Sequence, residues 1–118
     1  MKLDLSQVDQ VYLACGYTDM RKSIDGLAAI VQGTFHMDPF HRDLFLFCGR
    51  RCDRIKGLLW DEDGFLLLYK RLENGRFQWP RTSADVQALS RQQLRWLLEG
   101  LSIEQKTMIR TVHPETCY

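Results

Sequence analysis

The sequence predicts an α+β fold: a mostly antiparallel sheet of four to five strands with two helices packed on one face. The first observation is a series of short apolar runs bounded by glycine, proline, asparagine and aspartate, a pattern typical of strands. The second is a pair of segments whose apolar residues recur three and four positions apart, which favours amphipathic helices. The third is Asn74-Gly75, a dipeptide that favours a tight hairpin turn.

The first strand and the first helix are expected near the start of the chain. Residues 11–15 form an apolar run closed by Gly16, which predicts a buried strand. Thr18 or Asp19 is a candidate N-cap for a helix from about Met20 to Gln32, and Gly33 is its candidate end. The helix carries one apolar stripe, made of Met20, Ile24, Leu27, Ala28 and Val31.

The remaining elements follow in the second half of the chain. Strands are expected over residues 44–48, 54–60, 65–72 and 76–79, the last two joined by Asn74-Gly75. Ser90 with Gln93 makes a capping box for a closing helix. Its apolar face and its C-terminal cap are Leu94, Leu97, Leu98, Leu101 and Gly100. We expect residues 1–101 to form a single domain and residues 102–118 to be a C-terminal tail, in which a short helix is an alternative.

Alternation along these strands predicts which side chains share a face of the sheet. If the loop over residues 61–64 is even, one face is core: Ile55, Gly57, Leu59, Leu66, Leu68, Leu72, Phe77 and Trp79, with Lys70 as its one charge. The other face is basic at one end: Arg54, Lys56, Tyr69, Arg71, Arg76 and Gln78, with Glu73 as its only acid. Its other end is apolar: Leu58, Trp60, Phe65 and Leu67. This apolar end is either ordinary core under a helix, which we favour, or an exposed partner surface.

The net charge of +1 provides no global field that would draw the protein to DNA, so any nucleic-acid surface must come from local clustering. Arginine and lysine beside an aromatic residue suit phosphate and base contacts, while a solvated polar face explains the same residues. Arg21 and Lys22 lie at the expected helix start, where a cation is mildly disfavoured. They indicate an anionic partner unless Asp19 and Asp25 balance them.

Catalytic and metal-binding arrangements are scarce in the sequence. His36 and His41 are five apart and Cys48 and Cys52 four apart, which fits zinc ligand pairs. However, only six residues separate His41 from Cys48, shorter than the usual loop between pairs, and an apolar strand is the simpler explanation for Cys48. Four aspartates are candidates for metal-dependent phosphoryl chemistry, but each has a simpler explanation. Asp19 is a helix cap, Asp25 can pair with Arg21 on the helix, and Asp61 and Asp63 are turn residues. We expect no enzymatic activity, no bound metal, no cofactor and no disulfide.

The location is expected to be cytoplasmic. Met1-Lys2-Leu3-Asp4 lacks the basic and apolar regions of a signal peptide. No apolar run approaches the roughly 20 residues that a transmembrane helix needs.

Four blocks of the sequence resemble the TnpB accessory proteins of the IS-sixty-six family of bacterial insertion sequences, which are distinct from the RNA-guided nucleases of the same name. The blocks are Gly16-Tyr17-Thr18-Asp19-Met20-Arg21-Lys22 with Asp25-Gly26-Leu27, residues 44–56, residues 61–80 and Leu97-Leu98-Glu99-Gly100-Leu101. Their order over residues 11–101 is more specific than any single motif. Cys52 stands where the family often has a polar residue, and the chain after Leu101 lies outside the resemblance.

The resemblance implies a non-catalytic protein that assists transposition beside a separate transposase. Basic residues of the similar blocks, with one tyrosine of the sheet face, are the candidate nucleic-acid-binding residues: Arg21, Lys22, Arg50, Arg51, Arg54, Lys56, Tyr69, Lys70, Arg71 and Arg76. Two functions follow as expectations. Either the protein contacts the phosphates of transposon-end or target DNA, or it is an adaptor that docks on the element-encoded transposase without binding DNA.

Overall fold

The computed structural model of the chain describes residues 5–105. Five strands and two helices are present in this part of the chain. In order they are β1 (Gln10–Ala14), α1 (Ile24–Gly33), β2 (Asp43–Cys48), β3 (Arg54–Asp61), β4 (Gly64–Arg71), β5 (Val86–Leu89) and α2 (Arg91–Leu98). No helix of residues 5–105 is long and apolar enough to cross a membrane.

The strands form one sheet in the order β4-β3-β2-β1-β5. The three pairs β1–β5, β2–β3 and β3–β4 are antiparallel, and β1–β2 is parallel. A parallel pair needs a long connection, which α1 supplies here. The predicted α+β class with a mostly antiparallel sheet is therefore confirmed, while β5 carried no clear signal in the sequence.

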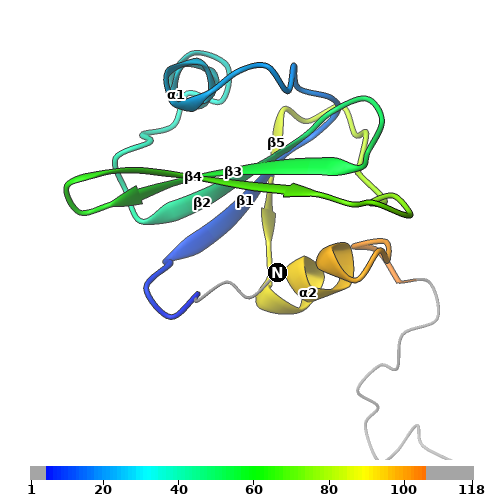
Figure 1. Cartoon of the computed structure of the whole chain (residues 1–118). Helices are drawn as coiled ribbons and strands as arrows, with labels where there is room; N and C mark the ends of the chain where they lie inside the picture. Colours follow the sequence, from blue (N-terminus) through cyan, green and yellow to red (C-terminus); the bar gives the residue numbers. More distant parts are fainter. Residues whose placement is uncertain (1–4, 106–118) are drawn as a thin grey trace, which may run out of the picture.

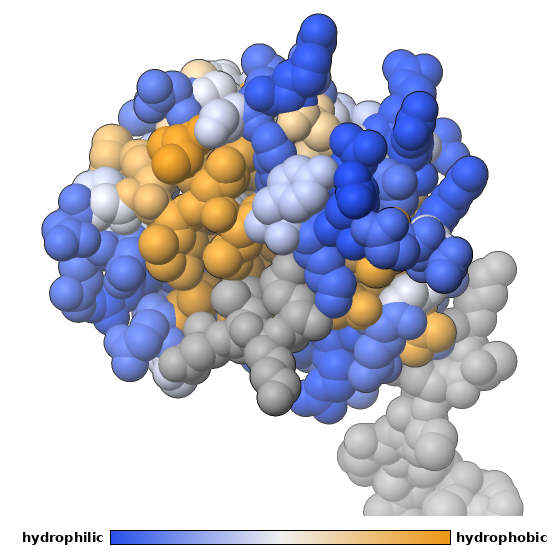
Figure 2. Space-filling view, viewed as in Figure 1, coloured by the Kyte–Doolittle hydropathy of each residue, from blue (hydrophilic) through white to orange (hydrophobic). Residues whose placement is uncertain are grey.

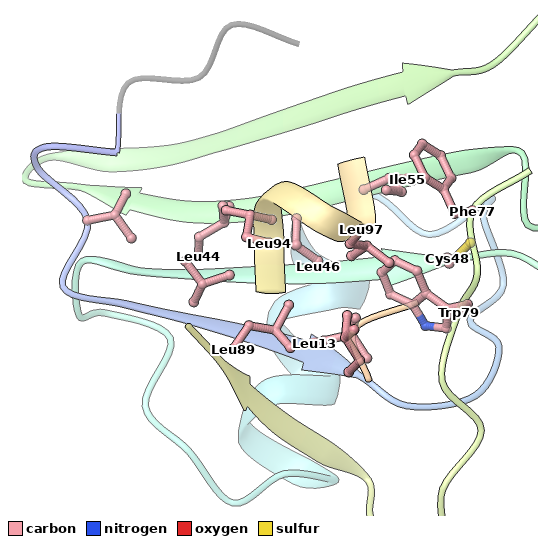
Figure 3. Close-up of a cluster of buried hydrophobic side chains, with 13 residues drawn as sticks. Leu13, Leu44, Leu46, Cys48, Ile55, Phe77, Trp79, Leu89, Leu94 and Leu97 are labelled. Carbon is pink, nitrogen blue, oxygen red and sulfur yellow. The ribbon is translucent and has the colours of Figure 1, made fainter. Parts of the chain in front are cut away.

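The two helices pack on opposite faces of the sheet, and the prediction that both lie on one face is wrong (Figure 1). The reason lies in β2, which is apolar on both sides. Leu44, Leu46 and Cys48 point into the cluster that contains Leu94 and Leu97 of α2 (Figure 3). Phe45 and Phe47 instead belong to the cluster under Leu27 and Val31 of α1. A central strand that is apolar on both sides needs a helix on each face.

The first helix begins later than predicted. Asp19 is not its N-cap: one carboxylate oxygen accepts a hydrogen bond of 3.0 Å from the backbone N–H of Arg21, and the Asp19 carbonyl accepts another from the N–H of Lys22 at 3.1 Å. The Asp19 carbonyl thus closes a tight turn with Lys22, whereas in an α-helix starting here it would accept from the N–H of Ser23. Ser23 is the residue at the N-cap position, so Arg21 and Lys22 precede α1 and do not belong to its first turn.

The segment after Asn74-Gly75 does not return along β4, and the strand predicted for residues 76–79 is absent. Because β5 pairs with β1 on the far side of the sheet, the chain must cross one end of the sheet between β4 and β5. Phe77 N–H donates to the Cys52 carbonyl at 2.7 Å, and the Trp79 indole N–H donates to the Ala14 carbonyl at 2.8 Å. Phe77 and Trp79 are buried core residues, as predicted, but they cover the ends of several strands.

The closing helix agrees with the sequence in its start and its end. The Ser90 hydroxyl and the Gln93 side chain form the predicted capping box, and Gly100 has the positive φ of 84° that ends a helix. Leu101, predicted on the apolar face, is 41% exposed, and Ile103 is buried in the core instead. The packed part of the protein thus reaches Ile103. Residues 106–118 of the expected tail, and the short helix considered there, lie outside the described residues.

The β3–β4 hairpin has the predicted side-chain alternation. Asp61 pairs with Gly64, so the turn is even and contains two residues. Arg54 pairs with Arg71 and Lys56 with Tyr69, as the alternation requires. At the other end of this face Leu58 is buried beneath α1, with Phe65 and Leu67 packed against the same cluster. For these three residues the favoured interpretation as core is confirmed. Trp60 is half-buried, and its ring packs edge-on against Phe40 and Phe65.

Candidate nucleic-acid interface

Strand direction collects the basic side chains at one end of the sheet. β1, β2 and β4 run the same way, and β3 runs against them, so the loops after β1, β2 and β4 meet at one end. Residues 72–85, which connect β4 to β5, pass over this end as well, and we call them the crossing segment. We call it the basic end and define it by eight residues: Arg21, Lys22, Arg50, Arg51, Arg54, Arg71, Arg76 and Arg81.

A hollow of about 620 Å³ opens between the loop after β1 and the loop after β2. It is lined by the backbone and side chains of residues 17–21 and 49–54, except Cys52. Four of these residues are arginines predicted from the sequence, Arg21, Arg50, Arg51 and Arg54. Gly49 allows the two loops to approach, because a Cβ at this position would lie 2.5 Å from Cγ of Met20.

A second hollow of about 510 Å³ adjoins the first and shares Tyr17, Arg50 and Arg51 with it. The crossing segment forms its other wall and contributes Arg76 and Arg81. The two hollows therefore form a continuous concave surface with arginines on both sides.

Two guanidinium groups approach the ring of Tyr17, a residue that both hollows share. The guanidinium carbon of Arg81 is 5.2 Å from the centre of the Tyr17 ring, and that of Arg50 is 5.9 Å away. Cation–π attraction at these distances holds the two cations near each other despite their repulsion. Tyr17 is 39% exposed and remains accessible to a ligand.

Sequence reasoning missed Tyr17 and Arg81 as site residues. Tyr17 did carry a signal, because it belongs to the block that resembles the family. Arg81 carried none, since its position depends on the crossing segment, where the Gly16 N–H donates to the Pro80 carbonyl at 3.0 Å.

Carboxylates neutralise only part of the basic end. Asp19 binds Arg21 at 2.9 Å and Glu73 binds Arg71 at 3.0 Å. The Arg21 guanidinium, through its hydrogen bonds, lowers the pKa of Asp19 to about 2. Hydrogen bonding to Glu73 likewise raises the pKa of Arg71.

Four guanidinium groups keep their charge without a carboxylate partner within residues 5–105: Arg50, Arg51, Arg76 and Arg81. Arg54 is only loosely paired with a carboxylate. Its Nε lies 3.8 Å from Oδ1 of Asp53, which is too far for a hydrogen bond. The same Nε is buried and has no hydrogen-bond partner among the described residues.

Lys56 lies inside the fold rather than on its surface. Lys56 is only 9% exposed, and its ammonium donates a hydrogen bond of 2.8 Å to the backbone carbonyl of Lys22. The ammonium also lies 5.8 Å from the ring of Tyr69, which is itself 50% exposed. The visible role of Lys56 is to fix the segment that carries Arg21 and Lys22.

The remaining two predicted site residues lie apart from each other. Lys22 is exposed directly before the N-cap of α1. Lys70 is half-buried and pairs with Ile55, a residue of the cluster on the α2 side of the sheet. Lys70 is therefore separated by the sheet from Tyr69 and Arg71.

The described residues contain no group of three or more His, Cys, Asp or Glu side chains that would hold a metal ion. Cys48 is buried in the core, and this burial raises the pKa of its thiol to about 12. A thiol of this kind is a poor metal ligand, because ligation requires the thiolate. Cys15, Cys48 and Cys52 are free thiols.

The fold and the basic end define a small α+β domain that presents arginines around an exposed tyrosine. The chain matches the family described as "IS66 Orf2 like protein" over residues 9–108, and it belongs to that family. It is thus an insertion-sequence-associated protein with an accessory role in transposition.

Two curated relatives are similar over most of their length, and both come from Sinorhizobium fredii (strain NBRC 101917 / NGR234). The uncharacterized protein y4hO is 39% identical over 92 residues, which cover 78% of this chain and 80% of the relative. The uncharacterized protein y4jC is 33% identical over 92 residues, which cover 78% and 79%. Neither name indicates a catalytic activity, and no solved structure matches the chain.

Proposed function

We propose that this protein is a non-catalytic accessory factor that contacts DNA phosphates through the basic end. The observation that carries the proposal is the pair of adjoining hollows that share Tyr17, Arg50 and Arg51. Guanidinium groups bind phosphate with two parallel hydrogen bonds, and an exposed aromatic ring offers a surface for a sugar or an unstacked base.

The unpaired charges of the basic end support DNA binding more strongly than the basic sheet face that the sequence predicts. Of the eight residues of the basic end, four arginines have no carboxylate partner within residues 5–105. These four arginines lie at separate points along a curved surface, which suits contacts to successive phosphates of a DNA strand. Because the contacts are to phosphate, the binding should depend weakly on DNA sequence.

The test is a salt titration of duplex DNA binding. With about four phosphates neutralised, log K should fall with log salt concentration at a slope of about −4. Arg50→Gln with Arg51→Gln should bring the slope to about −2, because two cations are removed.

The matched control removes two arginines from the opposite end of the sheet. Arg42 and Arg91 lie there, beside Glu62 and the carbonyl of Val8. Arg42→Gln with Arg91→Gln lowers the net charge equally and should leave the slope unchanged. Equal losses in both double variants would mean that net charge alone drives binding, and would reject the basic end as the site.

A protein that binds no duplex DNA even at low salt, but is retained by the transposase of its element, would instead support the adaptor function. Its membership of the family would stand in either case.

A further inference from the structure

We propose that two copies of this chain associate through β4, edge to edge and antiparallel, with Leu67 of each copy facing Leu67 of the other across a twofold axis. The proposal concerns the outer edge of β4, which shares only Arg71 with the basic end, and it does not depend on DNA binding. We infer that the binding partner of β4 is a second copy of the chain from the exposure, the charge pattern and the register of this strand.

β4 is an edge strand, and within residues 5–105 no strand pairs with its outer side. It has eight residues, whose backbone groups offer about 26 Å of unpaired hydrogen-bonding edge. The opposite edge, β5, has only four residues. An edge of this length is a template for pairing with another strand.

The side chains in the middle of β4 do not protect this edge. Residues 65–69 are Phe-Leu-Leu-Leu-Tyr, without a charge, a proline or a bulge in the pairing with β3. Leu66 is 45% exposed and Tyr69 50% exposed. Figure 2 shows hydrophobic side chains gathered at the level of the sheet, bordered by hydrophilic ones. Proteins usually block such edges with lysine or proline, so an apolar edge that residues 5–105 leave uncovered marks a pairing surface.

The charges that flank the apolar stretch make β4 complementary to itself. Asp63 precedes the strand together with Glu62, which pairs with Arg42, and the strand ends with Lys70 and with Arg71, which pairs with Glu73. An antiparallel partner of the same sequence places the acidic end of each copy beside the basic end of the other, whereas a parallel partner would place like charges together. Self-complementarity of one patch is what a twofold dimer requires.

The sheet faces restrict the register to axes that pass through a residue. For the two sheets to join with their α1 faces on the same side, each residue must oppose one of the same face. Centring the axis on Leu67 places Phe65 opposite Tyr69 of the second copy and Leu66 opposite Leu68. Asp63 then opposes Arg71 of the second copy.

A shift of the axis to Leu68 gives a poorer match. It would place Leu66 opposite Lys70 of the second copy and Phe65 opposite Arg71, and it would bring Asp63 opposite Glu73. The register centred on Leu67 avoids these pairs, since opposite charges and apolar pairs stabilise neighbouring strands and like charges destabilise them.

Sedimentation equilibrium of the full chain over a wide concentration range tests the association. The mass should rise from 13.9 kDa towards twice that value. Leu66→Lys should weaken the association by about tenfold or more, because it replaces the apolar pair of Leu66 with Leu68 of the second copy, and this pair occurs twice in the dimer. Tyr69→Lys, at the other exposed position, should have the same effect.

Leu101→Lys is the matched control, since Leu101 is a leucine of similar exposure, 41%, that lies outside β4. It should associate as the wild type does, and circular dichroism should show all three variants folded. A wild type that stays at 13.9 kDa at every concentration would overturn the proposal. Unchanged association of Leu66→Lys and Tyr69→Lys would overturn it as well.

Charge exchange tests the register. Asp63→Lys should weaken association by repelling Arg71 of the second copy, and so should Arg71→Asp. The double variant restores both opposite pairs and should associate more strongly than either single variant. A double variant weaker than both would show that Asp63 and Arg71 do not meet, which rejects the axis at Leu67.

Discussion

The ammonium of Lys56 donates a hydrogen bond of 2.8 Å to the backbone carbonyl of Lys22. A lysine on β3 thereby holds the segment before α1, whose own side chains belong to the basic end. The bond explains why a cation that sequence reasoning assigned to the DNA surface is buried in the fold.

Lys56→Met should therefore reduce stability more than it reduces DNA binding. Methionine keeps most of the apolar stem but leaves the Lys22 carbonyl without its donor. The expected loss is about 1.5–3 kcal/mol, as for hydrogen bonds to charged groups. Urea unfolding measures it, and Lys70→Met, at a half-buried lysine on the other face, should lose much less. A stable Lys56→Met protein with weakened DNA binding would restore Lys56 to the interface.

Gly49→Ala should disturb the wall of the first hollow. The added Cβ would lie 2.5 Å from Cγ of Met20, so the methionine must move and the loop that carries Arg21 moves with it. We expect a cost of about 1–3 kcal/mol, typical of overpacking. Met20→Ala in the same chain removes the clash, and the double variant should lose less than the two single variants summed. Additive losses in thermal unfolding would show that the two residues are not coupled.

Trp79→Phe should destabilise the crossing segment. The substitution keeps an aromatic ring in the core but removes the indole N–H that donates to the Ala14 carbonyl at 2.8 Å. An unsatisfied buried carbonyl costs about 1–3 kcal/mol. Trp96→Phe on α2 is the control, because Trp96 is half-buried and makes no indole hydrogen bond within residues 5–105. Equal losses of the unfolding free energy in the two variants would contradict the role of this bond.

Asp19 should titrate with a midpoint of about 2, because hydrogen bonds from the Arg21 side chain and backbone lower its pKa from the usual 3.8. A lowered carboxyl pKa means that the interaction stabilises the fold above pH 3.8 and is lost as the pH falls towards 2. Carboxyl NMR of the folded protein checks the midpoint. In an Arg21→Gln variant the midpoint should move up towards 3.8, and a midpoint that does not move would show that Arg21 is not its cause.

Cys48 should resist alkylation in the folded protein. Its thiol pKa is raised from 9.0 to about 12, chiefly by burial, which lowers the thiolate fraction by about a thousandfold at neutral pH. Mass spectrometry after iodoacetamide treatment should find Cys52, a half-buried thiol on the loop, modified before Cys48. Both thiols should react alike once the protein is unfolded in urea. Rapid modification of Cys48 in the native state would contradict its burial.

Local sequence signals determined much of this fold. The alternation of residues 54–71, the even turn at Glu62-Asp63, the capping box at Ser90 and the cap at Gly100 each depend on neighbouring residues. These features could therefore be predicted from the sequence without knowledge of the tertiary packing. The resemblance of the ordered blocks led to the family that the chain belongs to.

Tertiary structure decided what these local signals left open. Asn74-Gly75 is a strong hairpin signal, yet the next residues leave β4, because β5 pairs on the far side of the sheet and burial of Phe77 and Trp79 stabilises the crossing. The two-sided apolar character of β2 required helices on both faces. The basic end depends on the same long-range choices. Arg50 and Arg51 were visible in the sequence, but Arg81 reaches Tyr17 only because the crossing segment passes over the loop after β1. Contacts between residues distant in sequence are set by packing of the whole chain, and no local pattern records them.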